Sequence, residues 1–256
     1  MYAPTVPPTA PPRRRLTAGK VILLLFLLLI LLAFWYIARS GLVPVLAKLV
    51  GADKPVDLGV TSSAAQATSV VQKLGIKLDS PPAATNPAGY RKQYTGQVKI
   101  NQEISESEVS ALLNYNHVSY WAVKDAQVKI HGDGTVEAAL VVRTSELTIR
   151  RDGDVPTGIM RYLPAVLPDQ LPVYVKGRLD VVGPQQVSMD FQSIQIGRVN
   201  VPSSVVNGDA ESRATQYVND RLRNIPGLSI QAISYQDGKV HFKGTWPKEF
   251  RRIPIQ

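Results

Sequence analysis

The sequence predicts an α+β fold in which a long, strongly curved antiparallel β-sheet wraps around a long helix, preceded by one N-terminal transmembrane helix. Three features of the 256-residue chain predict this fold. An uncharged apolar run lies near the start, alternating apolar segments are joined by Asp-Gly turns, and two long segments change the phase of their alternation.

The N-terminal part resembles a membrane anchor. Residues 1–15 are rich in proline, so we expect a disordered cytoplasmic tail. Residues 16–38 contain the run VILLLFLLLILLAFWYIA, and about 20 apolar residues cross a bilayer core. A cleavable signal peptide is the alternative, but its apolar region is usually about 7–15 residues long. Because Arg13, Arg14 and Arg15 precede the run, we expect a single-pass cell-membrane protein with a cytoplasmic N-terminus and an extracytoplasmic C-terminal domain.

The composition argues against sites that depend on cysteine and against a nucleic-acid partner. The chain has no cysteine, so it has neither disulfides nor thiolate sites. The formal net charge is +9, but beyond residue 38 there are 25 basic and 20 acidic residues, a mild excess that does not indicate a nucleic-acid partner. We expect no cofactor.

Composition also suggests domain boundaries after the anchor. Residues 39–89 are rich in alanine, serine, threonine and proline, which predicts a stalk or linker. Residues 90–256 are long enough for one sizeable core and form the predicted extracytoplasmic lipid-binding-like domain.

The domain begins with a strand and a helix. Val98 and Ile100 alternate with polar residues, as in a half-buried strand. Ser105 and Glu108 then have the spacing of a capping box at the start of a helix.

Two hairpins and a later helix follow. Asp133-Gly134 and Asp237-Gly238 each lie between alternating runs, and Asp-Gly supplies the positive φ angles of tight primed turns. Residues 171–181 alternate as a strand. Residues 203–225 carry one apolar helical face that Pro226-Gly227 ends.

In the segment 187–201, the alternation of apolar and polar residues does not stay in one phase. Its alternation shifts at Gln192-Ser193 and again at Gly197-Arg198. An extra residue that preserves the inward face is a β-bulge, which bends and twists a strand. We therefore expect one long bulged strand over 187–201 and another over 135–150, curving around the 203–225 helix.

Three stretches in this order resemble the TULIP (tubular lipid-binding) superfamily, in particular the YpmS-like and LmeA-like groups of small membrane-anchored bacterial proteins. They are EISESEVSALLN, LDVVGPQQVSMDFQSIQIGRVNVPSSVV and IPGLSIQAISYQDGKVHFKGTWP, and the resemblance covers residues 94–249. It implies a curved sheet around a long helix, an apolar groove for acyl chains, and no catalytic residues. The proline-broken segment 155–170 departs from the pattern.

Catalytic and metal motifs are absent from the sequence. It contains neither G-x-S-x-G, nor H-E-x-x-H, nor a phosphate-binding loop. His117, His131 and His241 lie in separate predicted elements, so we expect no catalytic residue, no metal site and no enzyme.

The candidate site residues are apolar. A groove lining is one interpretation and a closed core is the other. The lipid-groove candidates are Ile159, Met160, Leu163, Val166, Leu167, Met189, Phe191, Ile194 and Ile196. A second set mixes aromatic rings with positive charge, as membrane-interface residues do, although a solvated tail is the alternative. These are Trp246, Phe250, Arg251 and Arg252.

Together these features predict a membrane-anchored, non-enzymatic binding protein for a lipid or a lipid-linked envelope component. The alternative is a structural scaffold of the cell envelope with a closed core. The two hypotheses differ in whether apolar volume is left open on the inner face of the sheet.

Overall fold

A computed structural model describes residues 18–41, 43–78, 90–115, 122–144, 168–206 and 211–254. The chain divides into two compact units, residues 1–36 and 37–256. The backbone is helical over α1 (Ala18–Arg39), whose side chains are described from Leu25 onward. Within the described residues, no helix is long and apolar enough to cross a membrane. The side chains of residues 16–24, which are part of the transmembrane helix expected over 16–38, lie outside the described residues.

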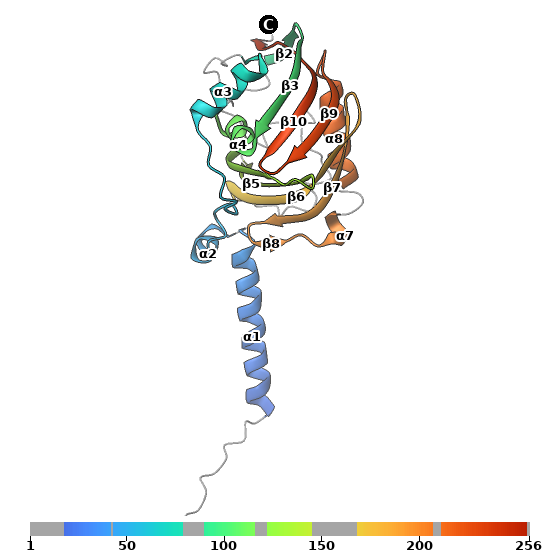
Figure 1. Ribbon diagram of the computed structural model, residues 1–256. Helices are drawn as coiled ribbons and strands as arrows, with labels where there is room; N and C mark the ends of the chain where they lie inside the picture. Colours follow the sequence, from blue (N-terminus) through green and yellow to red (C-terminus); the bar gives the residue numbers. More distant parts are fainter. Residues whose placement is uncertain are drawn as a thin grey trace, which may run out of the picture. The chain divides into compact units, whose positions relative to one another are not determined.

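The second unit combines helices with mostly antiparallel sheets, which confirms the α+β class (Figure 1). Its five-stranded sheet has the strands in chain order: β4 (Val123–Ile130), β5 (Thr135–Arg143), β6 (Gln170–Gly183), β7 (Gln186–Ile196) and β8 (Val199–Asn200).

Two smaller sheets complete the unit. One is antiparallel, in the order β3 (Val98–Ser105), β10 (Lys239–Trp246) and β9 (Ser229–Gln236). In the other, β11 (Glu249–Pro254) pairs in parallel with β1 (Lys77–Leu78) and antiparallel with β2 (Tyr90–Thr95).

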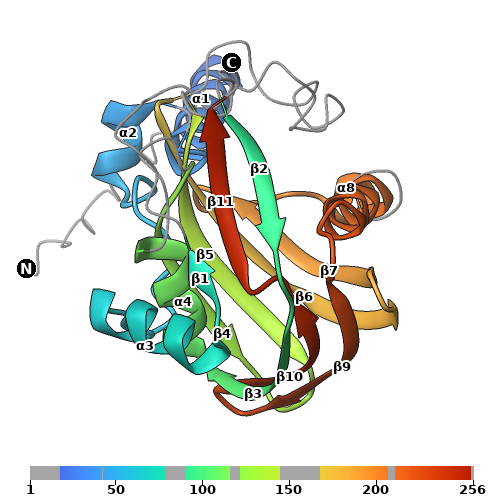
Figure 2. The ribbon, with the colours of Figure 1, turned by 90° about the horizontal axis from the view of Figure 1, so that it is seen from above.

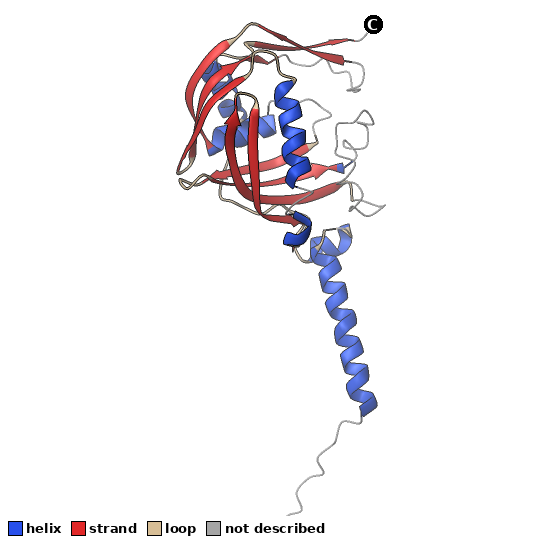
Figure 3. Cartoon of the chain, turned by 90° about the vertical axis from the view of Figure 1, so that its right-hand side faces the viewer, coloured by secondary structure: helices blue, strands red, loops and turns tan. Residues whose placement is uncertain are grey.

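The first predicted phase shift is a β-bulge. Lys176 pairs with Ser193 and the adjacent Gly177 pairs with Phe191, so Gln192 is the extra residue of β7. The bulge returns the apolar side chains to one face, as predicted, and the long strands of the sheet bend (Figure 3).

The second phase shift is a turn, so the prediction of one strand over 187–201 is wrong. Strand β7 ends at Ile196, and Gly197-Arg198 connects it to β8, which folds back against β7. Gly197 has a φ of +61°, which favours glycine. In the other long strand, predicted over 135–150, residues 145–150 lie outside the described residues.

The predicted hairpins are confirmed, but their turn type is not. Gly134 and Gly238 have φ angles of +84° and +74°. Asp125 is the one non-glycine residue with positive φ among those the structure describes, so neither Asp133 nor Asp237 adopts the positive φ of a primed turn.

The helix predicted over 203–225 corresponds to α7 (Ser203–Val205) and α8 (Glu211–Arg223), with residues 207–210 not described. Helix α8 lies beside β7, the outer long strand (Figure 2). It therefore flanks the sheet, and the expected arrangement, a sheet curving around this helix, is wrong on this point.

The described part of the predicted stalk is folded into the domain. It contains α2 (Pro44–Leu49) and α3 (Ala64–Leu74), which is capped by Ser63 and Gln66. Val70 of α3 is fully buried and joins a core cluster with Ile100 of β3. The stalk predicted over 39–89 is thus wrong for residues 39–78, which belong to the compact unit.

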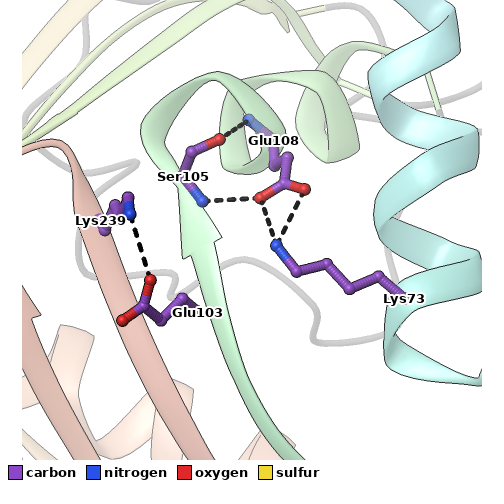
Figure 4. A network of polar contacts seen from close by, with 5 residues as sticks. All are labelled: Lys73, Glu103, Ser105, Glu108 and Lys239. Carbon is purple, nitrogen blue, oxygen red and sulfur yellow. Dashed lines mark hydrogen bonds and ion pairs between the residues drawn. The ribbon is translucent and has the colours of Figure 1, made fainter.

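The predicted capping box starts α4 (Glu106–Tyr115). The Ser105 amide donates to Glu108 Oε2 at 2.8 Å, and the Glu108 amide donates to Ser105 Oγ at 3.2 Å. Lys73 of α3 also donates to both Glu108 oxygens, which ties the two helices together (Figure 4).

Two apolar clusters hold the unit together. One is centred on Val70, Leu74 and Ile100, and the other on β7 and the start of β9. Phe242 and Trp246 of β10 pack against both clusters, so this strand joins them.

Candidate functional site

The apolar face of the five-stranded sheet is the largest candidate site. Cross-strand partners share a face, and Val175 pairs with Ile194 while Val173 pairs with Ile196. Across the bulge, Leu179 pairs with Met189 and Phe191 faces Gly177. The described groove candidates, Met189, Phe191, Ile194 and Ile196, therefore line one face.

These side chains are half-buried. All four are partly covered and partly open to solvent, and the same holds for their partners Val173, Val175 and Leu179. Strand β4 differs, because the apolar residues Val128 and Ile130 on the same face are buried. The middle strands thus carry an apolar surface that the described core covers only in part.

This apolar face is turned toward the sheet formed by β3, β10 and β9. Leu179 and Val181 of β6 pack in one cluster with Ile230 and Phe242 of β9 and β10. Tyr235 of β9 also donates from its hydroxyl to the Leu179 carbonyl oxygen at 2.6 Å. An occupant of the face would therefore lie on the side of the five-stranded sheet that faces the other sheet.

The opposite face carries a polar cluster around Glu137. His131 Nε2 donates to Glu137 Oε1 at 2.8 Å, and the Tyr174 hydroxyl donates to Oε2 at 2.7 Å. Lys176 Nζ lies 3.6 Å from Oε1. Burial raises the pKa of Glu137, but the bonds from Tyr174 and His131 and the charge of Lys176 outweigh burial and lower it.

This cluster is suited to holding strands together. A general base needs a pKa near the working pH and a free lone pair toward a substrate. The lowered pKa and three donors keep Glu137 ionised and occupied, and burial together with the bond to Glu137 raises the pKa of Tyr174 to about 12. The geometry therefore favours a structural role for the cluster.

Helix α4 covers the edge of β4 through side chains spaced four residues apart. Glu106 Oε2, Ser110 Oγ and Asn114 Oδ1 accept from successive edge amides of β4 at 3.1, 2.8 and 2.8 Å. Asn114 Nδ2 also donates to the Ala126 carbonyl oxygen at 2.8 Å. Asn114 thus pairs with the edge as a neighbouring strand would.

The edge of β7 is covered in the same way by α8. The Val187 amide donates to Asn219 Oδ1 at 2.8 Å, and Asn219 Nδ2 donates to the Val187 carbonyl oxygen at 3.0 Å. Sequence reasoning missed both asparagines, because one polar residue in an amphipathic helix looks like a solvent-facing one. The one available signal is the position of Asn219 beside apolar Val218.

The described membrane-interface candidates fall into two groups. Trp246 packs into the core, which argues against an interfacial role for it. Phe250 contacts Tyr94, with ring centroids 5.3 Å apart, and Arg251 pairs with Glu249 at 2.7 Å. Both lie in the strand β11, where the Arg251 side chain is 59% exposed, so the interpretations of a membrane interface and of a solvent-facing C-terminal segment both stay open for these two residues.

Several predicted positions cannot be placed. The side chain of Arg252 and residues 145–167, which include five groove candidates, lie outside the described part of the chain. The five are Ile159, Met160, Leu163, Val166 and Leu167.

Among the described side chains, no group of three or more His, Cys, Asp or Glu residues could hold a metal ion. No family model, curated protein or solved structure matches the chain.

Proposed function

We propose that the chain is a membrane-anchored, extracytoplasmic and non-enzymatic binding protein for a lipid or lipid-linked envelope component. The acyl chain would lie on the apolar face of β6 and β7. The observation that carries the proposal is the row of half-buried apolar side chains on that face, from Met189 to Ile196. The apolar run over residues 16–38 and the resemblance to tubular lipid-binding proteins support it further.

The energetics favour an apolar ligand. Each methylene group removed from water contributes about 0.8 kcal/mol, so a partly covered acyl chain would be held by several kcal/mol. No charged side chain has to be desolvated on this face between Met189 and Ile196, because Asp190 lies on the opposite face with its partner Arg178. The selectivity would therefore depend on chain length and shape.

Native mass spectrometry of the compact unit, residues 37–256, tests the proposal. We expect lipid to co-purify with this unit when it is expressed in a bacterial periplasm and released gently. A protein that never carries lipid, and that takes up none from mixed micelles, would contradict it.

A matched pair of variants locates the ligand. Ile194→Glu places a charge on the apolar face, whereas Gln195→Glu places the same charge one residue away on the opposite face. We expect Ile194→Glu to lose the bound lipid and Gln195→Glu to keep it, with both proteins folded by circular dichroism. Equal lipid content in the two variants would argue against this face.

The alternative of a scaffold that pairs through its sheet edges is less well supported. Asn114 and Asn219 already occupy the backbone groups of Ala126 and Val187 at the β4 and β7 edges. A partner strand would have to displace these side chains before it could pair there.

A further inference from the structure

Helix α2 presents apolar side chains to solvent. Val45 is 73% and Leu49 is 77% exposed, and they lie four residues apart on one side of the helix. Val43 and Val50, at either end of the helix, are exposed as well. Four exposed apolar side chains thus fall within eight successive positions. Exposed apolar side chains that gather in this way mark interaction sites.

The other side of this segment is fixed to the domain. Ala47 and Ala52 are 1% and 0% exposed, and the Ala52 amide donates to the Ala47 carbonyl oxygen at 2.8 Å. Arg198 donates to the carbonyl oxygens of Gly51 at 3.5 Å and Pro55 at 3.4 Å. The helix therefore has one face held against the domain and an apolar face directed away from it.

The position and charge of the segment indicate what covers the exposed face. It begins shortly after Arg39, the last residue of α1 and the end of the apolar run. Residues 37–52 contain Arg39 and Lys48 but no acidic residue. Apolar side chains beside basic ones are typical of helices that lie in the headgroup region of a bilayer with anionic lipids.

We infer that α2 and its flanking residues 43–50 are a membrane-interface element, with Val45 and Leu49 inserted at the headgroup boundary. The occupant of the exposed face is thus the bilayer that receives the N-terminal anchor. The inference rests on the proposed membrane anchoring and is independent of whether the apolar sheet face holds a lipid. It places the β7–β8 turn, which carries Arg198, at the membrane-facing end of the domain.

Site-directed spin labelling of the full chain tests the inference. Because the sequence has no cysteine, Val45→Cys and Leu49→Cys each create one labelling site. Val182→Cys is the matched control, since Val182 is also an apolar residue, 58% exposed, and lies at the distant β6–β7 hairpin. Each labelled protein is reconstituted in vesicles of phosphatidylcholine and phosphatidylglycerol, and collision rates with oxygen and with a water-soluble nickel chelate are measured.

We expect the oxygen-to-nickel collision ratio to be severalfold higher at positions 45 and 49 than at 182. Equal ratios at all three positions, in protein that floats with the vesicles, would overturn the inference and leave the anchor intact. Failure to float would overturn both the anchor and the inference. Spin–spin broadening at position 49 without protection from nickel would indicate contact between two copies instead of lipid, and would also overturn it.

Discussion

At the scale of single residues, Gly177 allows the bulge in β7. A Cβ atom added there would meet the carbonyl oxygen of Asp190 and lie 3.3 Å from the Cα atom of Phe191. Because backbone atoms cannot rotate away as a side chain can, Gly177→Ala must displace β7 from β6. We expect it to lower the free energy of unfolding by about 2–3 kcal/mol, as measured by urea denaturation of residues 37–256.

The control for this change is Gly183→Ala in the same strand. Its added Cβ would lie 3.4 Å from the Gln186 side chain, an ordinary contact. We expect a change within about 0.5 kcal/mol. Equal effects of the two substitutions would mean that the close approach at the bulge is not what constrains Gly177.

Asn219 is the second residue for which we predict a large effect, because an apolar side chain of similar size cannot make its hydrogen bonds. It is 6% exposed and pairs with both backbone groups of Val187. Asn219→Leu would leave these groups buried without partners, so we expect a loss of about 2–4 kcal/mol in urea denaturation. Asn200→Leu, at an exposed position of β8, is the comparison and should have little effect. A small effect at both positions would show that water replaces the Asn219 amide.

The polar cluster around Glu137 gives a pH dependence. The folded-state pKa of Tyr174 is raised from 10.0 to about 12, so its stabilising contribution is present below pH 10 and is lost as the pH rises toward 12. After discounting for solvent screening at this partly exposed site, we expect a loss of about 1 kcal/mol across that window. Tyr174→Phe should remove this loss, as measured by urea denaturation between pH 9 and about pH 12. If the stability of Tyr174→Phe falls with rising pH as steeply as before, groups other than Tyr174 cause the loss.

Glu137 makes the stability of the same cluster depend on pH in the acid range. Its folded-state pKa is lowered from 4.5, so its contribution is present above pH 4.5 and is lost as the pH falls through the folded-state value. Glu137→Gln should therefore reduce the loss of unfolding free energy at acid pH, as measured by urea denaturation. The alkaline range is tested separately, by Tyr174→Phe.

At the scale of elements, the start of α4 joins a cap to an ion pair through Glu108. Ser105→Ala removes the cap and should cost about 1 kcal/mol. Lys73→Ala removes an ion pair whose lysine is 34% exposed, and such pairs contribute about 0–1 kcal/mol. We therefore expect the serine substitution to be the more destabilising in thermal unfolding. The reverse order would show that the link between α3 and α4 matters more than the cap.

The same elements show how far local sequence signals reach. The capping box, the Asp-Gly hairpins and the bulge at Gln192 were predictable because each is set by residues within a few positions. The apolar alternation likewise placed Met189, Phe191, Ile194 and Ile196 on one face. The turn at Gly197-Arg198 was not distinguished from a second bulge, since both shift the alternation by one residue.

What depended on long-range contacts could not be predicted. Val70 lies in the segment predicted as a stalk, and its packing against Ile100 places it in the core. Asn219 and Val187 are 32 positions apart, and their pairing follows from where α8 docks. The stretch 43–50 lies in the segment predicted as a stalk, and its exposed apolar face becomes visible only when Ala47 and Ala52 are seen to be buried.

At the scale of the whole molecule, the segment that follows α1 is fastened to the end of the five-stranded sheet. The Arg198 amide donates to the Arg39 carbonyl oxygen at 2.7 Å. A Cβ atom at Gly197 would lie 2.6 Å from the carbonyl oxygen of Ser40 and 2.8 Å from that of Arg39. A long flexible stalk would leave the residues after α1 without fixed contacts, whereas this contact holds residues 39–41 against the β7–β8 turn.

Gly197→Ala should therefore release the segment. The added methyl group cannot share space with the Ser40 carbonyl, so we expect faster amide hydrogen exchange over residues 39–55 of the full chain, with the core strands β6 and β10 still protected. Gly59→Ala is the control, because Gly59 also has positive φ, +72°, but no atom within 4 Å of an added Cβ. It introduces the same backbone strain without the collision. If both variants exchange alike over residues 39–55, the backbone strain of alanine at a positive φ, and not the collision with Ser40, would account for the faster exchange.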